Sequence, residues 1–287
     1  MDKRSSRIGK GRRGGLALIV ECAVDEGRPS VRSKTYWNKD RGGADPFEIP
    51  KRVASGIEAC QSSMHEDGAV AHPLRYIWMY ITEAGLRQDG EHPQSEDLLG
   101  LDGWLNVIDE SASLGAEWMV VYVGASLSQV PYIWEVCAWA QDVHGLRVGL
   151  HLTSNCLSED DIERLSRLDP EKTYLVADKA HLASLRFLES KGIRLCEANV
   201  RATERDTYCT KPEEMACVGA DGRLFSCGLV LGDERYAMGN YRDRSLHDVY
   251  ADQSLPHAVP DTNAFPPSGC DACPPLMAMH ALDKEAP

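Results

Sequence analysis

The sequence contains no apolar run long enough to span a bilayer, and it has no glycine-rich phosphate loop, dinucleotide-binding glycine pattern or nucleophile elbow. It therefore gives no sign of a P-loop NTPase, a Rossmann dehydrogenase or an α/β-hydrolase. The apolar stretch that follows Arg12 and Arg13 is interrupted by Glu21, which makes it too short for an export signal. We expect a cytoplasmic protein that does not enter a membrane.

Positive charge is also scarce outside the first residues. The net charge is −13, and residues 1–13 contribute +5, so the rest of the chain carries −18. A body this acidic repels phosphate backbones, which argues against nucleic-acid binding. We predict that residues 1–14 form a basic, disordered tail.

Strand and helix signals alternate through residues 71–203. Apolar runs at 75–81, 118–123, 146–152, 173–178 and 193–198 are separated by amphipathic helical segments. Such alternation favours right-handed crossovers and a parallel sheet. Continuous apolar runs are typical of strands that are covered on both faces. We predict an α/β fold, a partial parallel (βα) barrel of about five to six strands.

Two smaller units flank this predicted barrel. Residues 15–70 contain two strand candidates and a helix candidate that starts near Asp45, so we expect a small N-terminal ββα unit. Residues 204–287 are rich in proline and loops, and their clearest feature is a hairpin with Asp221 and Gly222 as its turn. A segment with so little core of its own suits one that is held by a metal.

The cysteines of this last segment form a spaced pattern. Cys209 begins a C-x12-G-x4-C stretch that ends at Cys227, and Cys270 and Cys273 form a C-x2-C pair. Four thiolates of this kind can hold either an iron–sulfur cluster or zinc, and the spacing alone does not choose between them. Cys217, in the hairpin strand, is a spare cysteine whose role as a ligand stays open.

The same stretch is similar to the SPASM/twitch extension of radical SAM enzymes. The resemblance rests on Cys209, Gly222, Cys227, Gly239 with Asn240, Ser245 with Leu246, Cys270 and Cys273. It implies a loop-rich SPASM/twitch extension in which Cys209, Cys227, Cys270 and Cys273 hold one auxiliary 4Fe–4S cluster. The further cysteines of the full SPASM form are absent, so the resemblance is to the shorter twitch type.

The barrel region resembles the same family with its catalytic motif missing. The family's first strand runs into C-x3-C-x2-C, and here the corresponding positions hold Ala84, Gln88 and Glu91. The family's Gly-Gly-Glu-Pro motif, which binds the cosubstrate, is replaced at residues 123–126 by Val-Gly-Ala-Ser. The resemblance therefore implies a degenerate member that binds no S-adenosylmethionine and has no catalytic residues.

Polar residues at or beyond strand ends form a second candidate set. They are Thr82, Glu83, His151, Thr153, Asp178, Glu197, Asn199 and Arg201. Parallel α/β folds bind ligands at this edge. The set either fills a vacated cavity or lines a real binding pocket.

The resemblance implies an iron–sulfur pseudoenzyme that presents substrate, or relays electrons, to a radical SAM enzyme that modifies peptides or proteins. The expected partners are that enzyme and its peptide or protein substrate. Two alternatives stay open: an enzyme with non-radical chemistry at the strand ends, and a structural zinc protein.

Overall fold

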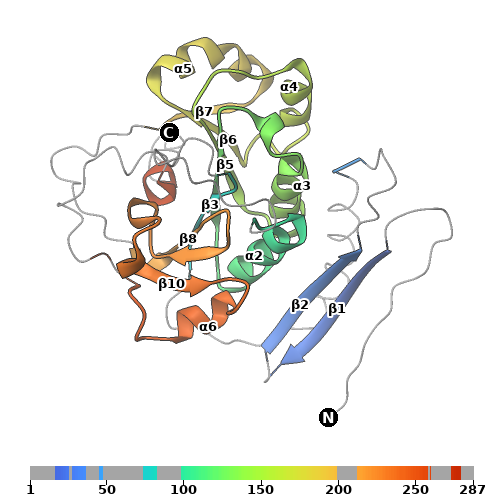
Figure 1. Cartoon of the computed structure of the whole chain (residues 1–287). Coiled ribbons are helices and arrows are strands. Elements are labelled where there is room, and N and C mark those ends of the chain that lie inside the picture. Colours follow the sequence, from blue (N-terminus) through green and yellow to red (C-terminus); the bar gives the residue numbers. More distant parts are fainter. Residues whose placement is uncertain are drawn as a thin grey trace, which may run out of the picture.

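The computed structural model describes residues 17–25, 28–36, 45–47, 74–82, 98–198, 212–257, 259 and 273–278. Within these ranges the central feature is an eight-stranded sheet with the order β10-β9-β8-β3-β4-β5-β6-β7 (Figure 1). Its strands are β3 (Tyr76–Tyr80), β4 (Trp118–Gly124), β5 (Arg147–Leu152), β6 (Thr173–Ala177), β7 (Arg194–Glu197), β8 (Met215–Val218), β9 (Arg223–Phe225) and β10 (Ala237–Asn240).

The five strands expected from the apolar runs are all present, as β3 to β7, and they pair in parallel in chain order. Strand β8 pairs in parallel with the outer side of β3 and adds a sixth parallel strand. Strands β9 and β10 then continue the sheet in antiparallel fashion. The sheet is open, with edges at β10 and β7.

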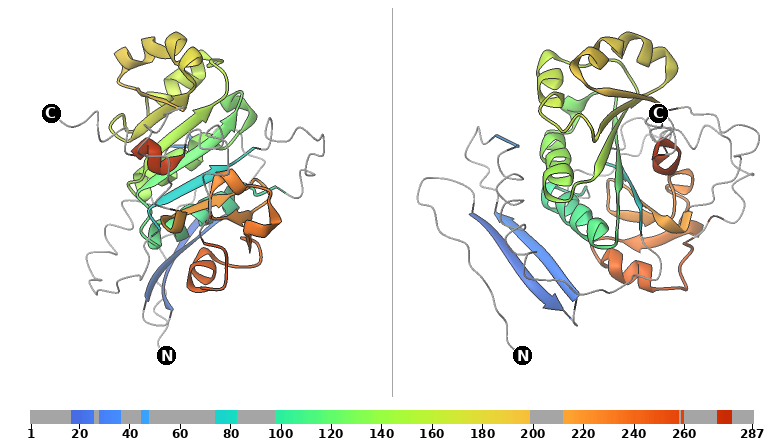
Figure 2. Two further views of the ribbon diagram at one scale, coloured as in Figure 1. Left: turned by 90° about the vertical axis from the view of Figure 1, so that its left-hand side faces the viewer. Right: turned by 180° about the vertical axis from the view of Figure 1, so that it is seen from behind.

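Helices cover one face of this sheet. They are α2 (Leu101–Ser113), α3 (Ile133–Ala138) with a π-helical continuation at Trp139–Val143, α4 (Glu159–Leu165) and α5 (Lys179–Leu185), followed by a 3-10 segment at Arg186–Lys191. The short α6 (Leu246–Ala251) lies beside α2. The helical 273–278 segment lies on the opposite face, as Figure 2 shows.

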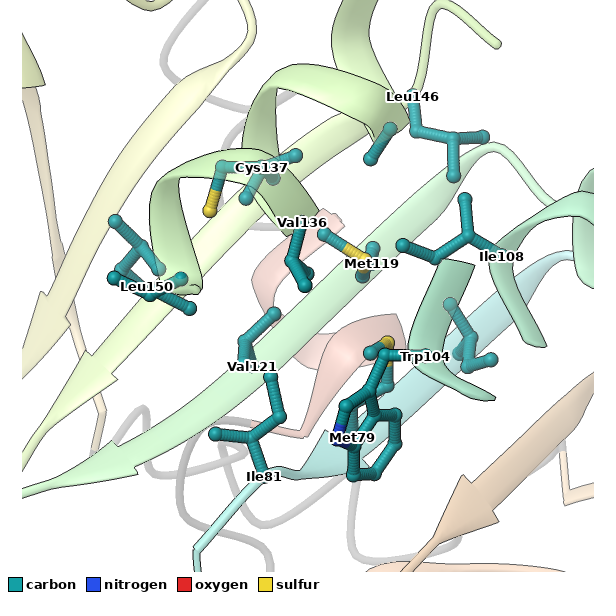
Figure 3. Packing of buried hydrophobic residues seen from close by; sticks show 14 of the residues in the cluster. Met79, Ile81, Trp104, Ile108, Met119, Val121, Val136, Cys137, Leu146 and Leu150 are labelled. Carbon is teal, nitrogen blue, oxygen red and sulfur yellow. The ribbon is translucent and has the colours of Figure 1, made fainter. Parts of the chain in front are cut away.

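The strands are apolar throughout because both of their faces are buried. In β4, Met119, Val121 and Val123 pack against the helices. Figure 3 shows Met119 and Val121 with Val136 of α3 and Trp104 of α2. The alternate residues Trp118, Val120 and Tyr122 face the other side, which we call the inner face. Two-sided burial explains why these runs read as continuous rather than alternating.

The hairpin was predicted correctly, but the prediction that its turn has two residues was wrong. Gly219 N–H donates to the carbonyl of Arg223, so the connection is the three residues Ala220, Asp221 and Gly222. Gly222 has φ +83°, the left-handed conformation that glycine adopts most readily. Asp221 accepts the backbone N–H of Arg223, which stabilises the longer turn.

Side-chain caps mark several helix starts. Ser158 and Asp161 form a capping box at the start of α4, because each side chain accepts the backbone N–H of the other residue. Ser245 caps α6 by accepting the N–H of Asp248. Gly192 ends the helical region after α5 with φ +82°.

The N-terminal unit is described only in part. Strands β1 (Ala17–Asp25) and β2 (Arg28–Tyr36) form a separate antiparallel pair, as expected. The helix predicted after Asp45 lies outside the described residues, except for 45–47. There, Phe47 is buried and Arg167 lies over its ring at 4.1 Å, so this short segment packs on the α/β unit. No helix in the described ranges has the length and hydropathy needed to traverse a bilayer.

The carboxylate of Glu110 links the C-terminal segment to α2. Glu110 of α2 accepts the backbone N–H of Leu246 at 2.6 Å and the hydroxyl of Tyr241 at 2.9 Å. The first bond satisfies an N–H at the start of α6, which has no partner within its own helix. Both bonds link residues far apart in the sequence.

We expect Glu110→Ala to destabilise the attachment of α6, because it leaves two partly buried donors without an acceptor. The expected loss is about 2 kcal/mol in the free energy of unfolding, with faster amide exchange in α6. Urea unfolding combined with hydrogen exchange would measure both. Glu163→Ala, an exposed change on α4, is the control; equal effects of the two variants would contradict the link.

Candidate metal centre and the inner face of the sheet

Two of the four predicted ligands lie in the described part of the chain. Cys227 follows β9 and precedes a short 3-10 turn at Gly228–Val230, and Cys273 opens the 273–278 segment. Both are buried, with 5% and 6% of their surface exposed. Both belong to the same cluster of side chains on the inner face. Cys209 and Cys270 lie outside the described residues.

A third sulfur joins these two. Cys217 in β8 is fully buried, which raises the pKa of its thiol well above the usual value, and charge on Cys227 and Cys273 raises it further. The pKa of the Tyr80 hydroxyl is raised by burial and then by the same three cysteines. Cys217, Cys227 and Cys273 therefore belong, with Tyr80, to one buried cluster in which their charges act on one another. Sequence reasoning treated Cys217 as a spare because the pairing of β8 with β3 could not be foreseen.

The turn after Cys227 is shaped around its sulfur. The N–H of Leu229 donates to Cys227 Sγ at 3.3 Å. A Cβ on Gly228 would lie 2.5 Å from Cζ3 of Trp78 and 2.7 Å from the Tyr80 hydroxyl oxygen, so only glycine fits. The turn is therefore held tightly against two aromatic rings, which keep water away from Cys227.

These features fit a thiolate ligand, because N–H donors to sulfur and a dry surrounding are what tune cysteine ligands of clusters. The fit is incomplete in the part of the chain that the structure describes. There, no three His, Cys, Asp or Glu side chains are arranged to hold a metal ion. The four-cysteine ligand set therefore stays a prediction that depends on Cys209 and Cys270.

The inner face beside the cysteines is filled with rings and apolar side chains. Trp78 and Tyr80 lie 5.3 Å apart between ring centroids, and Tyr80 and Tyr122 are also 5.3 Å apart. Trp118 and Tyr174 pack at 5.1 Å nearer the other end of the strands. The 273–278 segment packs on this aromatic surface.

The strand-end set is brought together only in part. Thr82, Thr153 and Asp178 follow β3, β5 and β6, whose carboxyl ends share one edge of the sheet. Glu197 ends the next strand, β7. Asp178 has a local role, because its side chain accepts the N–H of His181 and caps α5. Glu83, Asn199 and Arg201 lie outside the described residues.

His151 is the most unusual member of that set. Its ring lies edge-on to Tyr122 at 5.2 Å, and its buried Nδ1 has no hydrogen-bond partner among the described residues. Burial lowers the pKa of His151 to about 4, against a smaller raising effect of the Asp178 charge. The imidazole is therefore neutral at pH 7.

We expect His151 to make the fold sensitive to acid. Above pH 6.5 the imidazole is neutral in both the folded and the unfolded chain. Below pH 6.5 the unfolded chain takes up a proton first, so stability falls until the pH reaches the folded pKa of about 4. Between pH 8 and pH 5 the loss from this group is about 2 kcal/mol.

His151→Phe keeps a ring beside Tyr122 and removes the titration. Urea unfolding at pH 8 and pH 5 should show a smaller acid loss in this variant than in the wild type, by that amount. Parallel pH profiles for the two proteins would show that His151 is not neutralised by burial.

No family model matches the chain, and no curated protein matches it. Among solved structures, it is similar to BtrN in complex with AdoMet and 2-DOIA, with 12% identity, a TM-score of 0.46, and coverage of 66% of this chain and 85% of that one. It is also similar to Streptococcus suis SuiB bound to its precursor peptide SuiA, with 10% identity, a TM-score of 0.44, and coverage of 77% and 74%. With TM-scores below 0.5, these matches do not define the architecture, which follows from the chain's own strand order.

Proposed function

We propose that this chain is an iron–sulfur-binding protein of the SPASM/twitch type that serves as a non-catalytic partner of a radical SAM enzyme. In this proposal Cys209, Cys227, Cys270 and Cys273 hold one 4Fe–4S cluster. The partner enzyme modifies a peptide or protein, and this chain presents that substrate or relays electrons to the enzyme.

The main support for the proposal is that Cys227 and Cys273 lie in the same buried cluster. They come from the two halves of the cysteine pattern, yet they are buried in one side-chain cluster and both act on the pKa of Cys217. Burial and neighbouring sulfurs raise the pKa of the Cys217 thiol, so with nothing bound it stays neutral. Metal binding would deprotonate cysteines gathered in this way, and their gathering in one cluster supports a ligand role for Cys227 and Cys273.

A 4Fe–4S cluster at this place would supply one-electron transfer or an anchoring point for a substrate. The chain's own residues set the conditions for either role. Trp78 and Tyr80 exclude water from the side of Cys227, and the Leu229 N–H directs a positive dipole at its sulfur. Such N–H donors stabilise negative charge on a ligand sulfur and raise the reduction potential of its cluster.

The non-catalytic part of the proposal rests on missing groups. Neither Ala84 nor Gln88 is a credible cluster ligand. At residues 123–126 the carboxylate of the family motif is absent, and Ser126 instead accepts the N–H of Ser128 to begin a 3-10 turn. The inner face is already filled by rings and by the 273–278 segment. We therefore propose that the chain neither binds nor cleaves S-adenosylmethionine.

We expect anaerobically purified protein to be brown and to contain about four iron and four sulfide per chain. Single Cys→Ser changes at 209, 227, 270 or 273 should each remove most of the iron, because a cluster needs all its thiolates. Cys156→Ser, at an exposed cysteine beyond β5, is the matched control and should retain it. Iron and sulfide assays with visible absorption measure the outcome.

The alternatives give different results in the same preparation. A colourless protein with one zinc would replace the cluster by a structural zinc site. Formation of 5′-deoxyadenosine from S-adenosylmethionine would refute the non-catalytic role. Failure to co-purify anaerobically with a radical SAM peptide-modifying enzyme would leave the cluster but remove the partner role.

A further inference from the structure

We propose that the inner face under residues 273–278 is a peptide-binding groove, which the chain's own C-terminal segment occupies in place of a substrate peptide. The proposal rests on the proposed function and deepens it, since it says where and how a peptide would be held. The side chain that such a peptide inserts is methionine, or one similarly long, unbranched and apolar.

The first observation is a notch in the sheet that receives a methionine. Gly149 is the one residue in its cross-strand row, between Val120 and Tyr174, that has no side chain. Met277 fills this gap: its Cε lies 2.9 Å from the place where a Cβ on Gly149 would be. Val120 and Val176 form the walls, with methyl groups 3.3 and 3.4 Å from the same place. Any larger residue at position 149 would close the notch.

The second observation is that two polar atoms on this face lack partners. Within the part of the chain that the structure describes, Nε1 of Trp78 and Nδ1 of His151 are buried without a hydrogen bond. Both side chains belong to the inner face, and His151 lies two residues along β5 from Gly149. Buried polar atoms are normally satisfied, and each unpaired one costs about 1–3 kcal/mol. The present occupant therefore leaves the face incompletely satisfied.

A peptide in an extended form matches both observations. Its backbone carries a carbonyl for the Trp78 N–H and an N–H for the neutral Nδ1 of His151, while its side chain enters the notch. The surrounding rings of Tyr122, Trp118 and Tyr174 suit a thioether, because methionine sulfur packs favourably against aromatic edges. The 273–278 segment supplies the side chain, but leaves the two polar atoms unpaired.

Occupation by a segment of the same chain has a clear thermodynamic consequence. The covalently attached segment competes with any free peptide, so the apparent affinity for that peptide is reduced by the fraction of molecules in which the groove is closed. Weakening the attached segment while keeping the notch should raise the apparent affinity. Filling the notch at position 149 should abolish binding of the free peptide, whether or not the attached segment has been weakened.

The test uses the full chain and a synthetic peptide with the sequence of its residues 274–280, PPLMAMH. Fluorescence anisotropy of the labelled peptide gives the affinity. We expect the Met277→Ala protein to bind it about ten-fold more tightly than the wild type. Adding Gly149→Val to Met277→Ala should abolish binding. The peptide carrying both Met277→Asp and Met279→Asp changes should bind neither protein.

Two controls separate this result from misfolding. Gly100→Ala adds a Cβ where nothing lies within 4 Å, so in the Met277→Ala background it should leave peptide binding unchanged. If Gly149→Val does not fold by circular dichroism, Gly149→Ala replaces it, because its Cβ meets only the flexible end of residue 277 and two methyl groups. Absence of binding to Met277→Ala, or binding that survives the filled notch, would overturn the proposal.

The readout does not require a metal. Anisotropy reports peptide binding whether the protein contains iron, zinc or neither. A brown protein that fails this test would lose the groove and keep the proposed cluster. A colourless protein that passes it would keep the groove and lose the cluster.

Discussion

The pairing of β8 with β3 is the constraint on which the rest of the molecule depends. It places the first strand of the C-terminal hairpin inside the sheet, with Cys217 opposite Trp78. The turn after β9 then falls against Trp78 and Tyr80, and Cys227 with it. Without this pairing the cysteine pattern would belong to a separate appendage. With it, Cys217, Cys227 and Cys273 share one buried cluster with aromatic residues of the sheet.

The two faces of the sheet differ in the side chains that they bury. On the helix-covered face, Met119, Val121 and Leu150 belong to the larger apolar cluster, which α2 and α3 complete. The inner face has aromatic residues, cysteines and a buried neutral histidine. On the strands of this second face, Trp78 and His151 keep buried polar atoms that have no partner among the described residues. The second face keeps polar atoms at a cost, which is typical of a surface retained for a ligand.

The sequence predicted well what depends on neighbours along the chain, and poorly what depends on contacts between distant segments. The parallel strands β3 to β7 followed from apolar runs of neighbouring residues. The three-residue turn before Arg223 depends on Asp221 accepting a backbone N–H, which the Asp-Gly dipeptide alone did not reveal. The insertion of Met277 over Gly149 joins residues with no sequence relation, so no local pattern could predict it.

The proposed centre and the proposed groove cannot be independent, because one short helical turn carries a residue of each. The N–H of Met277 donates to the carbonyl of Cys273 at 3.0 Å, so the two residues lie one turn apart on the same rigid element. A ligand that fixes Cys273 also fixes where Met277 can reach. Conversely, a peptide that displaces Met277 from Gly149 must tilt or unwind the turn that begins at Cys273. Binding at either place therefore changes the free energy of binding at the other by the same amount, which makes the short 273–278 segment the physical link between them.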